Sequence, residues 1–273
     1  MTKMLGAIIG DIVGSRFEFN PTNNYDFELF SEECSFTDDT ICTVAVADAM
    51  IKGRDFGKSL HEWCQRYPHP MGGYGGRFAG WVFRDDPQPY NSFGNGSAMR
   101  VSPVAHWFEK ESQVLDAAAQ TALPTHNHDE GVKGAQTVAL AIFKALQYPF
   151  GEASKHVDEI IGECVDFSGY DINIQKSAVI NKFDETCQGT VPVALKIIGM
   201  ATSFEDAIRI AVSLGADADT LGAITGSIAE AIWGIPSDIR QKAETFLPEE
   251  MLSVLNEFSI KCKTPFNFLS PNA

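Results

Sequence analysis

The sequence predicts an all-α fold, because apolar residues recur along most of the chain at the spacing of one helix face. Strict alternation of apolar and polar residues, which would indicate half-buried strands, is nearly absent. The chain has 273 residues, 44% of them hydrophobic, so it can bury a substantial core. No linker-like stretch divides it. We therefore expect residues 1–273 to form a single compact domain of many helices packed around a central element.

Seven segments carry the helical pattern most clearly. They lie near residues 5–13, 42–50, 135–146, 193–200, 207–214, 221–232 and 251–258. The first contains Asp11 and is not followed by a small-residue cleavage site, so we expect a helix of the fold and not a signal peptide. No apolar run is long enough to span a membrane. Residues 17–36 and 68–95 lack the pattern and are predicted to be loops.

Glycines recur at every fourth position in two of these predicted helices. Gly6, Gly10 and Gly14 share one face of the first, and Gly222 and Gly226 share a face of a late one. A glycine inside a helix costs roughly 1 kcal/mol relative to alanine. We therefore expect these faces to allow close approach of another helix.

Composition limits the classes of partner. A formal net charge of −15 argues against a general nucleic-acid-binding protein, because binding to the phosphate backbone depends on Lys and Arg. A small anionic ligand is still compatible with this charge if metals and helix N-termini supply local positive potential. The six cysteines form no Cys-x-x-Cys pair, which disfavours a zinc site and a disulfide framework. A reducing, cytoplasmic setting is therefore expected.

An acidic motif occurs twice. Residues 37–40 read Thr-Asp-Asp-Thr, residues 217–220 read Asp-Ala-Asp-Thr, and each motif leads directly into an apolar helical run. One such motif is most simply a helix cap. Two of them indicate more, because clustered carboxylates repel one another unless a cation lies between them. Oxygen ligands without His or Cys favour Mg²⁺, Mn²⁺ or Ca²⁺, so a metal site and a pair of caps both remain open.

Two acidic residues near the N-terminus allow further interpretations. For Asp11 we favour a buried carboxylate whose hydrogen bonds are satisfied by a neighbouring helix end. Glu18, flanked by Phe17 and Phe19, could be a carboxylate in an apolar mouth, with a raised pKa suited to proton transfer. From its local sequence alone, however, plain exposure to solvent is the favoured interpretation of Glu18.

Two glycine-rich segments could let the backbone approach a ligand. Residues 72–76 supply Gly73, Tyr74 and Gly75, and residues 95–100 read as a loop opening a helix whose N–H groups could bind a phosphate. Neither has the Lys-Ser/Thr ending of a Walker loop and neither follows a strand, and tight turns would explain each alone. His126 precedes a predicted helix, where a hydrogen bond to substrate or a helix cap is expected more than a metal ligand.

Together these motifs resemble those of the ADP-ribosylglycohydrolase family, the DraG-like enzymes. The resemblance extends from Leu5 to Pro236. It is carried, in order, by residues 6–18, 37–40, 91–100, 125–126 and 215–226. Ala216 is a departure, since a glycine is common there, but its methyl group removes no ligand. The resemblance implies an all-α orthogonal bundle of the ADP-ribosylglycohydrolase type with a binuclear Mg²⁺ or Mn²⁺ centre.

The resemblance also implies roles for particular residues. The implied metal ligands are Thr37, Asp38, Asp39, Asp217, Asp219 and Thr220. The implied ADP-ribose contacts are Asn95, Gly96, Ser97 and His126, and we add Gly73, Tyr74 and Gly75 as further candidates for substrate contact. The expected catalytic carboxylates are Asp38, Asp39 and Glu18, of which Glu18 takes the place of an acidic residue that gates the metal site in some members.

The expected function is metal-dependent hydrolysis of the N- or O-glycosidic bond of an ADP-ribose conjugate, either a modified protein or a small molecule. No nucleic-acid or membrane partner is expected. Two alternatives stand beside this expectation. The protein could bind ADP-ribose without cleaving it, like the crystallins that resemble this family, or it could be a dimetal phosphoesterase acting on the pyrophosphate.

Overall fold

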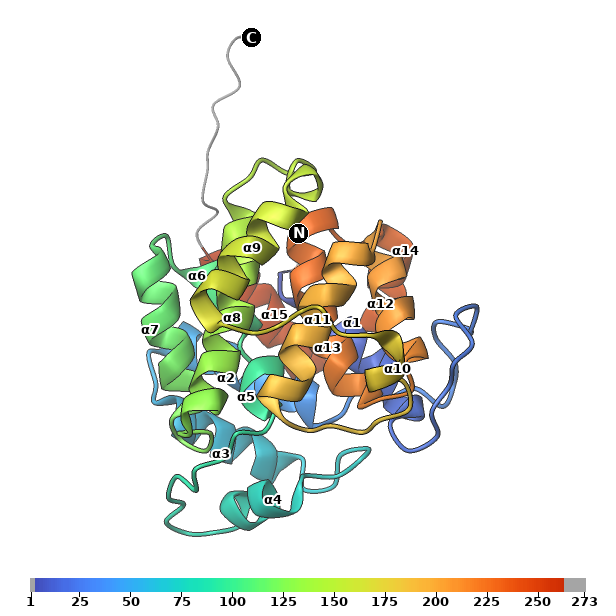
Figure 1. The fold of residues 1–273 in the computed structure, drawn as a ribbon. Helices are drawn as coiled ribbons and strands as arrows, with labels where there is room; N and C mark the ends of the chain where they lie inside the picture. The colour runs from blue at the N-terminus through green and yellow to red at the C-terminus, as the bar shows by residue number, and fades with distance from the viewer. Residues whose placement is uncertain (1–2, 263–273) are drawn as a thin grey trace, which may run out of the picture.

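The computed structural model describes residues 3–262, and within that range the fold contains helices and no β-sheet (Figure 1). The strand-like pairings in these residues are two isolated bridges, between Thr37 and Met71 and between Gly94 and Thr186. The predicted all-α class is therefore confirmed. No described helix has both the length and the hydropathy needed to cross a membrane.

The helices follow one another along the whole chain. In order they are α1 (Leu5–Gly14), η1 (Ser15–Phe17), α2 (Asp38–Lys52), α3 (Phe56–Arg66), α4 (Gly76–Val82), α5 (Gly96–Met99), α6 (Ser102–Trp107), α7 (Glu111–Ala122), α8 (Asp129–Leu146), η2 (Ala153–Lys155), α9 (Val157–Ser168), α10 (Lys176–Val179), α11 (Cys187–Met200), α12 (Phe204–Ser213), α13 (Ala218–Trp233), α14 (Ser237–Glu244) and α15 (Glu249–Lys261).

All seven segments with a clear apolar pattern are helical, as predicted. The prediction of a continuous loop over residues 68–95 is wrong, because α4 lies inside it. Phe78, Trp81 and Val82 give α4 a short buried face at helical spacing. Residues 75–80 contain three glycines, and because glycine is a poor helix former, the sequence of this segment does not predict a helix. The segment 17–36 is irregular after η1, as expected.

Two helices from opposite ends of the chain form the centre of the fold. Every residue of α1 is buried, and α1 packs along α13 through the glycine faces predicted from the sequence. A β-carbon added at Gly10 would lie only 1.9 Å from the carbonyl oxygen of Gly222. The backbones are thus in direct contact, and the expected close approach is confirmed.

The remaining helices surround this pair. Helices α2, α8, α11 and α12 contact α1, α13 or both, while α3 and α15 pack on α2, and α7 and α9 pack on α8 (Figure 1). The buried hydrophobic side chains form one continuous core cluster. All six cysteines are free and buried within it. This arrangement brings the N-termini of α2 and α13 near each other, although they are far apart in sequence.

Candidate active site

Asp11 links the central helix α1 to the start of α2. Its carboxylate accepts hydrogen bonds from the backbone N–H of Thr37 (3.0 Å) and of Thr40 (3.1 Å). The hydroxyls of the same two threonines also donate to it, at 2.7 Å from Thr37. Burial raises the pKa of Asp11 to about 6, and these four hydrogen bonds oppose that shift. The expected role of Asp11, a buried carboxylate satisfied by a helix end, is confirmed.

The first acidic motif is the N-terminus of α2. Thr37 is the N-cap residue, and its hydroxyl accepts a hydrogen bond from the backbone N–H of Asp39 at 3.2 Å. Asp38 and Asp39 occupy the first helical turn. Because the Thr37 side chain is fully buried between Asp11 and this turn, it does not line the cavity described below.

The second acidic motif is the N-terminus of α13. Asp217 is the N-cap residue, and Asp219 and Thr220 lie in the first turn. The side-chain amide of Asn95 donates to Asp217 Oδ2 at 2.7 Å, and the backbone N–H of Thr220 donates to Asp219 Oδ1 at 2.9 Å. These two bonds fix both carboxylates at the helix start.

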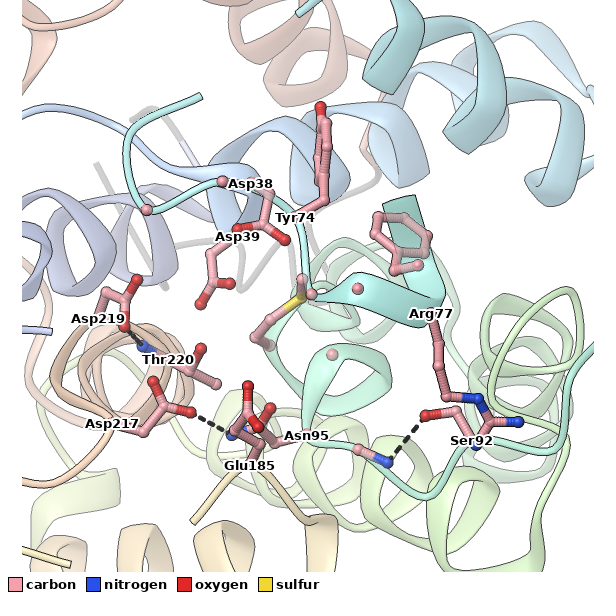
Figure 2. A pocket seen from close by; sticks show the side chains of 18 of the residues that line it. Asp38, Asp39, Tyr74, Arg77, Ser92, Asn95, Glu185, Asp217, Asp219 and Thr220 are labelled. Carbon is pink, nitrogen blue, oxygen red and sulfur yellow. Dashed lines mark hydrogen bonds between the residues drawn. The ribbon is translucent and has the colours of Figure 1, made fainter. Parts of the chain in front are cut away.

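The two helix starts face one cavity of about 440 Å³. Figure 2 shows their side chains directed toward a shared space from opposite walls. The residues that line it from these two motifs are Asp38, Asp39, Asp217, Asp219 and Thr220. The fold therefore places four carboxylates and a hydroxyl at a single site.

These carboxylates lie where ionisation is unfavourable. Burial, and then the charges of neighbouring carboxylates, raise the pKa values of Asp38 and Asp39 well above the ordinary range. The pKa of Asp219 is raised in the same way, first by burial and then by the charge of Asp217. Burial raises the pKa of Asp217 itself to about 7. One buried oxygen, Oδ2 of Asp39, has no hydrogen-bond partner.

The chemistry of this donor set fits a hard divalent cation. All the side-chain atoms available as metal ligands are oxygen atoms. The carboxylates repel one another, and a cation between them would offset that repulsion. Oδ2 of Asp39 is buried and accepts no hydrogen bond, so it is free to bind a cation. Among the described residues, no three Asp, Glu, His or Cys side chains are grouped closely enough to hold a metal ion as they stand.

Glu18 lies at the edge of the same cavity, half-buried beneath a glycine loop. A β-carbon on Gly72 would come within 2.4 Å of Glu18 Oε2, and Gly72 has a φ of 76°, so this position suits only glycine. Burial, followed by the negative charges of Asp219 and Asp11, raises the pKa of Glu18 to about 8. The prediction of simple solvent exposure for Glu18 is wrong, because the loop at Gly72 covers it.

The glycine loop contributes backbone to the cavity wall. Gly73, Tyr74 and Gly75 all line the cavity. The hydroxyl of Tyr74, however, lies against the carbonyl oxygen of Tyr67 at 2.7 Å, and its ring is directed away from the carboxylates in Figure 2. Gly75 is the N-cap residue of α4. The part of Tyr74 available to a ligand is thus mainly its backbone.

The remaining predicted contacts separate into two groups. Asn95, Gly96 and His126 line the cavity. Ser97 does not, because its fully buried hydroxyl donates to the carbonyl oxygen of Gly131 at 2.7 Å. Ser97 thereby joins the short helix α5 to α8, which is a structural contact.

Several lining residues were not singled out from the sequence. Arg77 stacks on Tyr90, with its guanidinium carbon 5.0 Å from the ring centroid, and both residues line the cavity. The rings of Phe19 and Phe183 stack at 6.2 Å, and Glu185 lies on the same wall as Phe183. Arg77 follows the glycine loop and could have been noted as a cation beside it. Phe183 and Glu185 lie in a stretch without a motif, where no local signal identifies them.

Comparison with known proteins identifies related chains. The sequence model of the family described as ADP-ribosylglycohydrolase matches residues 3–265. The chain is 25% identical to ADP-ribosylhydrolase ARH3 of Danio rerio, over 86% of this chain and 82% of that protein. It is 27% identical to ADP-ribosylarginine hydrolase Tri1 of Pseudomonas putida (strain GB-1), over 85% of this chain and 70% of that protein.

A solved structure has the same fold. It is described as an ADP-ribosylglycohydrolase-related protein complex, and it matches with a TM-score of 0.70 and 22% identity over 95% of this chain and 96% of that chain. The orthogonal helical bundle expected from the resemblance is thus the observed architecture. Since the family model covers nearly the whole sequence, the chain belongs to the ADP-ribosylglycohydrolase family of glycosidase-type hydrolases.

Proposed function

We propose that the protein hydrolyses the N- or O-glycosidic bond at the anomeric carbon of an ADP-ribose conjugate, in a reaction that depends on two divalent cations. The observation that carries this proposal is the convergence of two acidic helix N-termini on one cavity. The names of the related proteins, an ADP-ribosylhydrolase and an ADP-ribosylarginine hydrolase, support the substrate class. The substrate would be an ADP-ribosylated protein or small molecule, and the proposed setting is the cytoplasm.

The proposed cations are Mg²⁺ or Mn²⁺. Their ligands would be Thr37, Asp38, Asp39, Asp217, Asp219 and Thr220. When bound, such cations lower the pKa of water and polarise substrate oxygens. Asn95 would keep Asp217 oriented through its 2.7 Å hydrogen bond, and Asp11 would hold the first turn of α2 in place. Five of the six proposed ligands line the cavity, and Thr37 supports them from behind.

The carboxylates would also move protons. Glu18 lies at the edge of the cavity, with one oxygen, Oε2, that has no hydrogen-bond partner. A protonated carboxyl there can donate to the departing acceptor group, while Asp38 or Asp39 takes a proton from the attacking water. Positive charge that develops on the ribose ring would be stabilised by the anionic side chains around it. The cavity wall near Asn95, Gly96 and His126 would bind the ADP portion.

Substrate panels test this proposal directly. Arginine-linked and serine-linked ADP-ribosylated peptides and a small ADP-ribose conjugate are incubated with the full chain and Mg²⁺ or Mn²⁺. Free ADP-ribose is the expected product, and chelation of the metal should stop its release. Formation of AMP would instead identify a phosphoesterase, and tight ADP-ribose binding without turnover would identify a non-catalytic binder; either result refutes the proposal.

Variants of the cavity carboxylates, with a matched surface control, test whether the reaction takes place in this cavity. Asp39→Asn and Asp219→Asn should each lower kcat/KM by at least about 100-fold, because each removes a charged ligand for the cation. Asp166→Asn, which changes an exposed aspartate on α9, serves as the control and should behave like the wild type. Full activity in both cavity variants would contradict the assignment.

A further inference from the structure

A buried arginine forms part of the cavity wall. Arg100 is 1% exposed, and its Nη2 donates to the carbonyl oxygen of Thr121 at 2.9 Å and to the hydroxyl of Thr125 at 2.8 Å. Both acceptors are uncharged. A guanidinium group can only donate hydrogen bonds, so the direction of both bonds is fixed.

The hydroxyl of Thr125 connects this arginine to His126. Thr125 is fully buried, and its Oγ1 lies 2.7 Å from Nδ1 of His126. A hydroxyl has one proton and two lone pairs. Since one lone pair accepts from Arg100, the proton of Thr125 is left without an acceptor unless Nδ1 takes that role. Buried polar groups are almost always paired, so Thr125 donates to Nδ1 and that nitrogen carries no proton.

The imidazole must also be neutral. Burial lowers the pKa of His126 well below its ordinary value, and the positive charges of Arg100 and Arg77 act in the same direction. A neutral imidazole has a single N–H group, and with Nδ1 as the acceptor this group is on Nε2. Nε2 makes no hydrogen bond to the protein within residues 3–262, and it lies beside Gly96, where an added β-carbon would be 3.1 Å away. The ring lines the cavity.

We propose that Thr125, anchored by Arg100, holds His126 as the neutral Nε2–H tautomer, so that the ring donates a hydrogen bond to an oxygen atom of the bound ligand. The identity of that ligand as ADP-ribose rests on the proposed function. The other tautomer would present a lone pair to the ligand oxygen and repel it. Thr125 does not line the cavity, so it is a positioning residue that acts on the ligand through His126, and Arg100 anchors its hydroxyl.

Nitrogen NMR of the ligand-free protein tests the tautomer. The full chain is labelled with ¹⁵N-histidine, and the signals of His126 are identified by their loss in His126→Gln. In the wild type and in Thr125→Ser, Nδ1 should be unprotonated and Nε2 protonated across neutral pH. Thr125→Val removes the hydroxyl and should give a mixture of both tautomers. A protonated Nδ1 in the wild type, or an unchanged pattern in Thr125→Val, would overturn the proposal.

Calorimetry with ADP-ribose tests the consequence for binding. Thr125→Val should weaken the affinity roughly three- to tenfold, the effect of one poorly oriented hydrogen bond, while Thr125→Ser stays within about twofold of the wild type. Thr137→Val is the matched control, because it removes a fully buried hydroxyl on α8, and it should bind normally. Equal affinities in Thr125→Val and wild type would overturn the proposal. If the wild type bound no ADP-ribose, the proposed function would fail. The NMR measurement would still test whether Thr125 holds His126 as the Nε2–H tautomer.

Discussion

Replacing Gly10 by alanine should destabilise the protein, although alanine is the better helix former. Propensity alone would favour the change by about 1 kcal/mol. The new β-carbon, however, would lie 1.9 Å from the carbonyl oxygen of Gly222 and 2.2 Å from its carbonyl carbon. Both neighbours belong to the backbone of α13, so no side chain can rotate aside, and the two central helices must separate.

The magnitude follows from the cost of overpacking. Extra methyl groups in a well-packed core typically cost about 1–3 kcal/mol, and a contact between two backbones lies at or above the upper end of that range. We expect Gly10→Ala to lower the free energy of unfolding by about 2–4 kcal/mol after the gain in propensity. The variant should also lose activity, because α1 carries Asp11 and α13 carries Asp219.

Urea unfolding followed by far-UV circular dichroism measures this effect. Gly162→Ala is the matched control, since Gly162 lies in the middle of α9 with no atom within 4 Å of an added β-carbon. The control should be more stable than the wild type by about 0.5–1 kcal/mol. If Gly10→Ala were as stable as Gly162→Ala, the close contact of α1 with α13 could not be a determinant of the fold.

Three further predictions concern buried acids. Asp11→Asn replaces an acceptor of four hydrogen bonds, one of them from the hydroxyl of Thr40, and should lower the unfolding free energy by about 2–3 kcal/mol, as measured in urea. Glu230 is largely shielded from solvent, and burial raises its pKa from 4.5 to about 7, so its folded form keeps a proton that the unfolded chain releases. Glu230 should therefore contribute a loss of up to about 3 kcal/mol in unfolding free energy as pH rises from 4.5 to 7, and Glu230→Gln should lose less stability than the wild type over this range by that amount; parallel pH profiles would contradict this. Asp39→Asn should raise the melting temperature without metal, because it removes a repelled charge, but it should abolish any rise in that temperature on adding Mn²⁺.

Local chemistry made several features predictable. Thr37 was expected near the start of a helix, and it caps α2 through its own hydroxyl, since capping depends on only three successive residues. The glycine spacing of α1 identified its contact face for a similar reason, because a period of four follows directly from helix geometry. The assignment of Asp11 to a helix end was also correct, as few other partners can satisfy a carboxylate inside an apolar helix.

Features that depend on distant segments could not be predicted. The burial of Glu18 depends on Gly72, 54 positions later, whose loop folds over the carboxylate. Phe183 and Glu185 reach the cavity only because the segment before α11 pairs with Gly94, through a bridge from Thr186. That the two acidic motifs share a cavity followed from family resemblance, since neither motif contains information about the other.

The energetics of the acidic motifs explain why the site depends on the packing of the core. A carboxylate at a helix N-terminus gains about 0.3–1 kcal/mol from the helix dipole. That gain is too small to offset the burial and mutual repulsion which raise the pKa values of Asp39 and Asp219 so far. The packing of α1 against α13 therefore has to hold these charges together against their repulsion, and Gly10, next to Asp11 in sequence, lies in that contact. A bound cation would reverse the sign of the interaction, so the same arrangement that strains the metal-free protein would stabilise the loaded one.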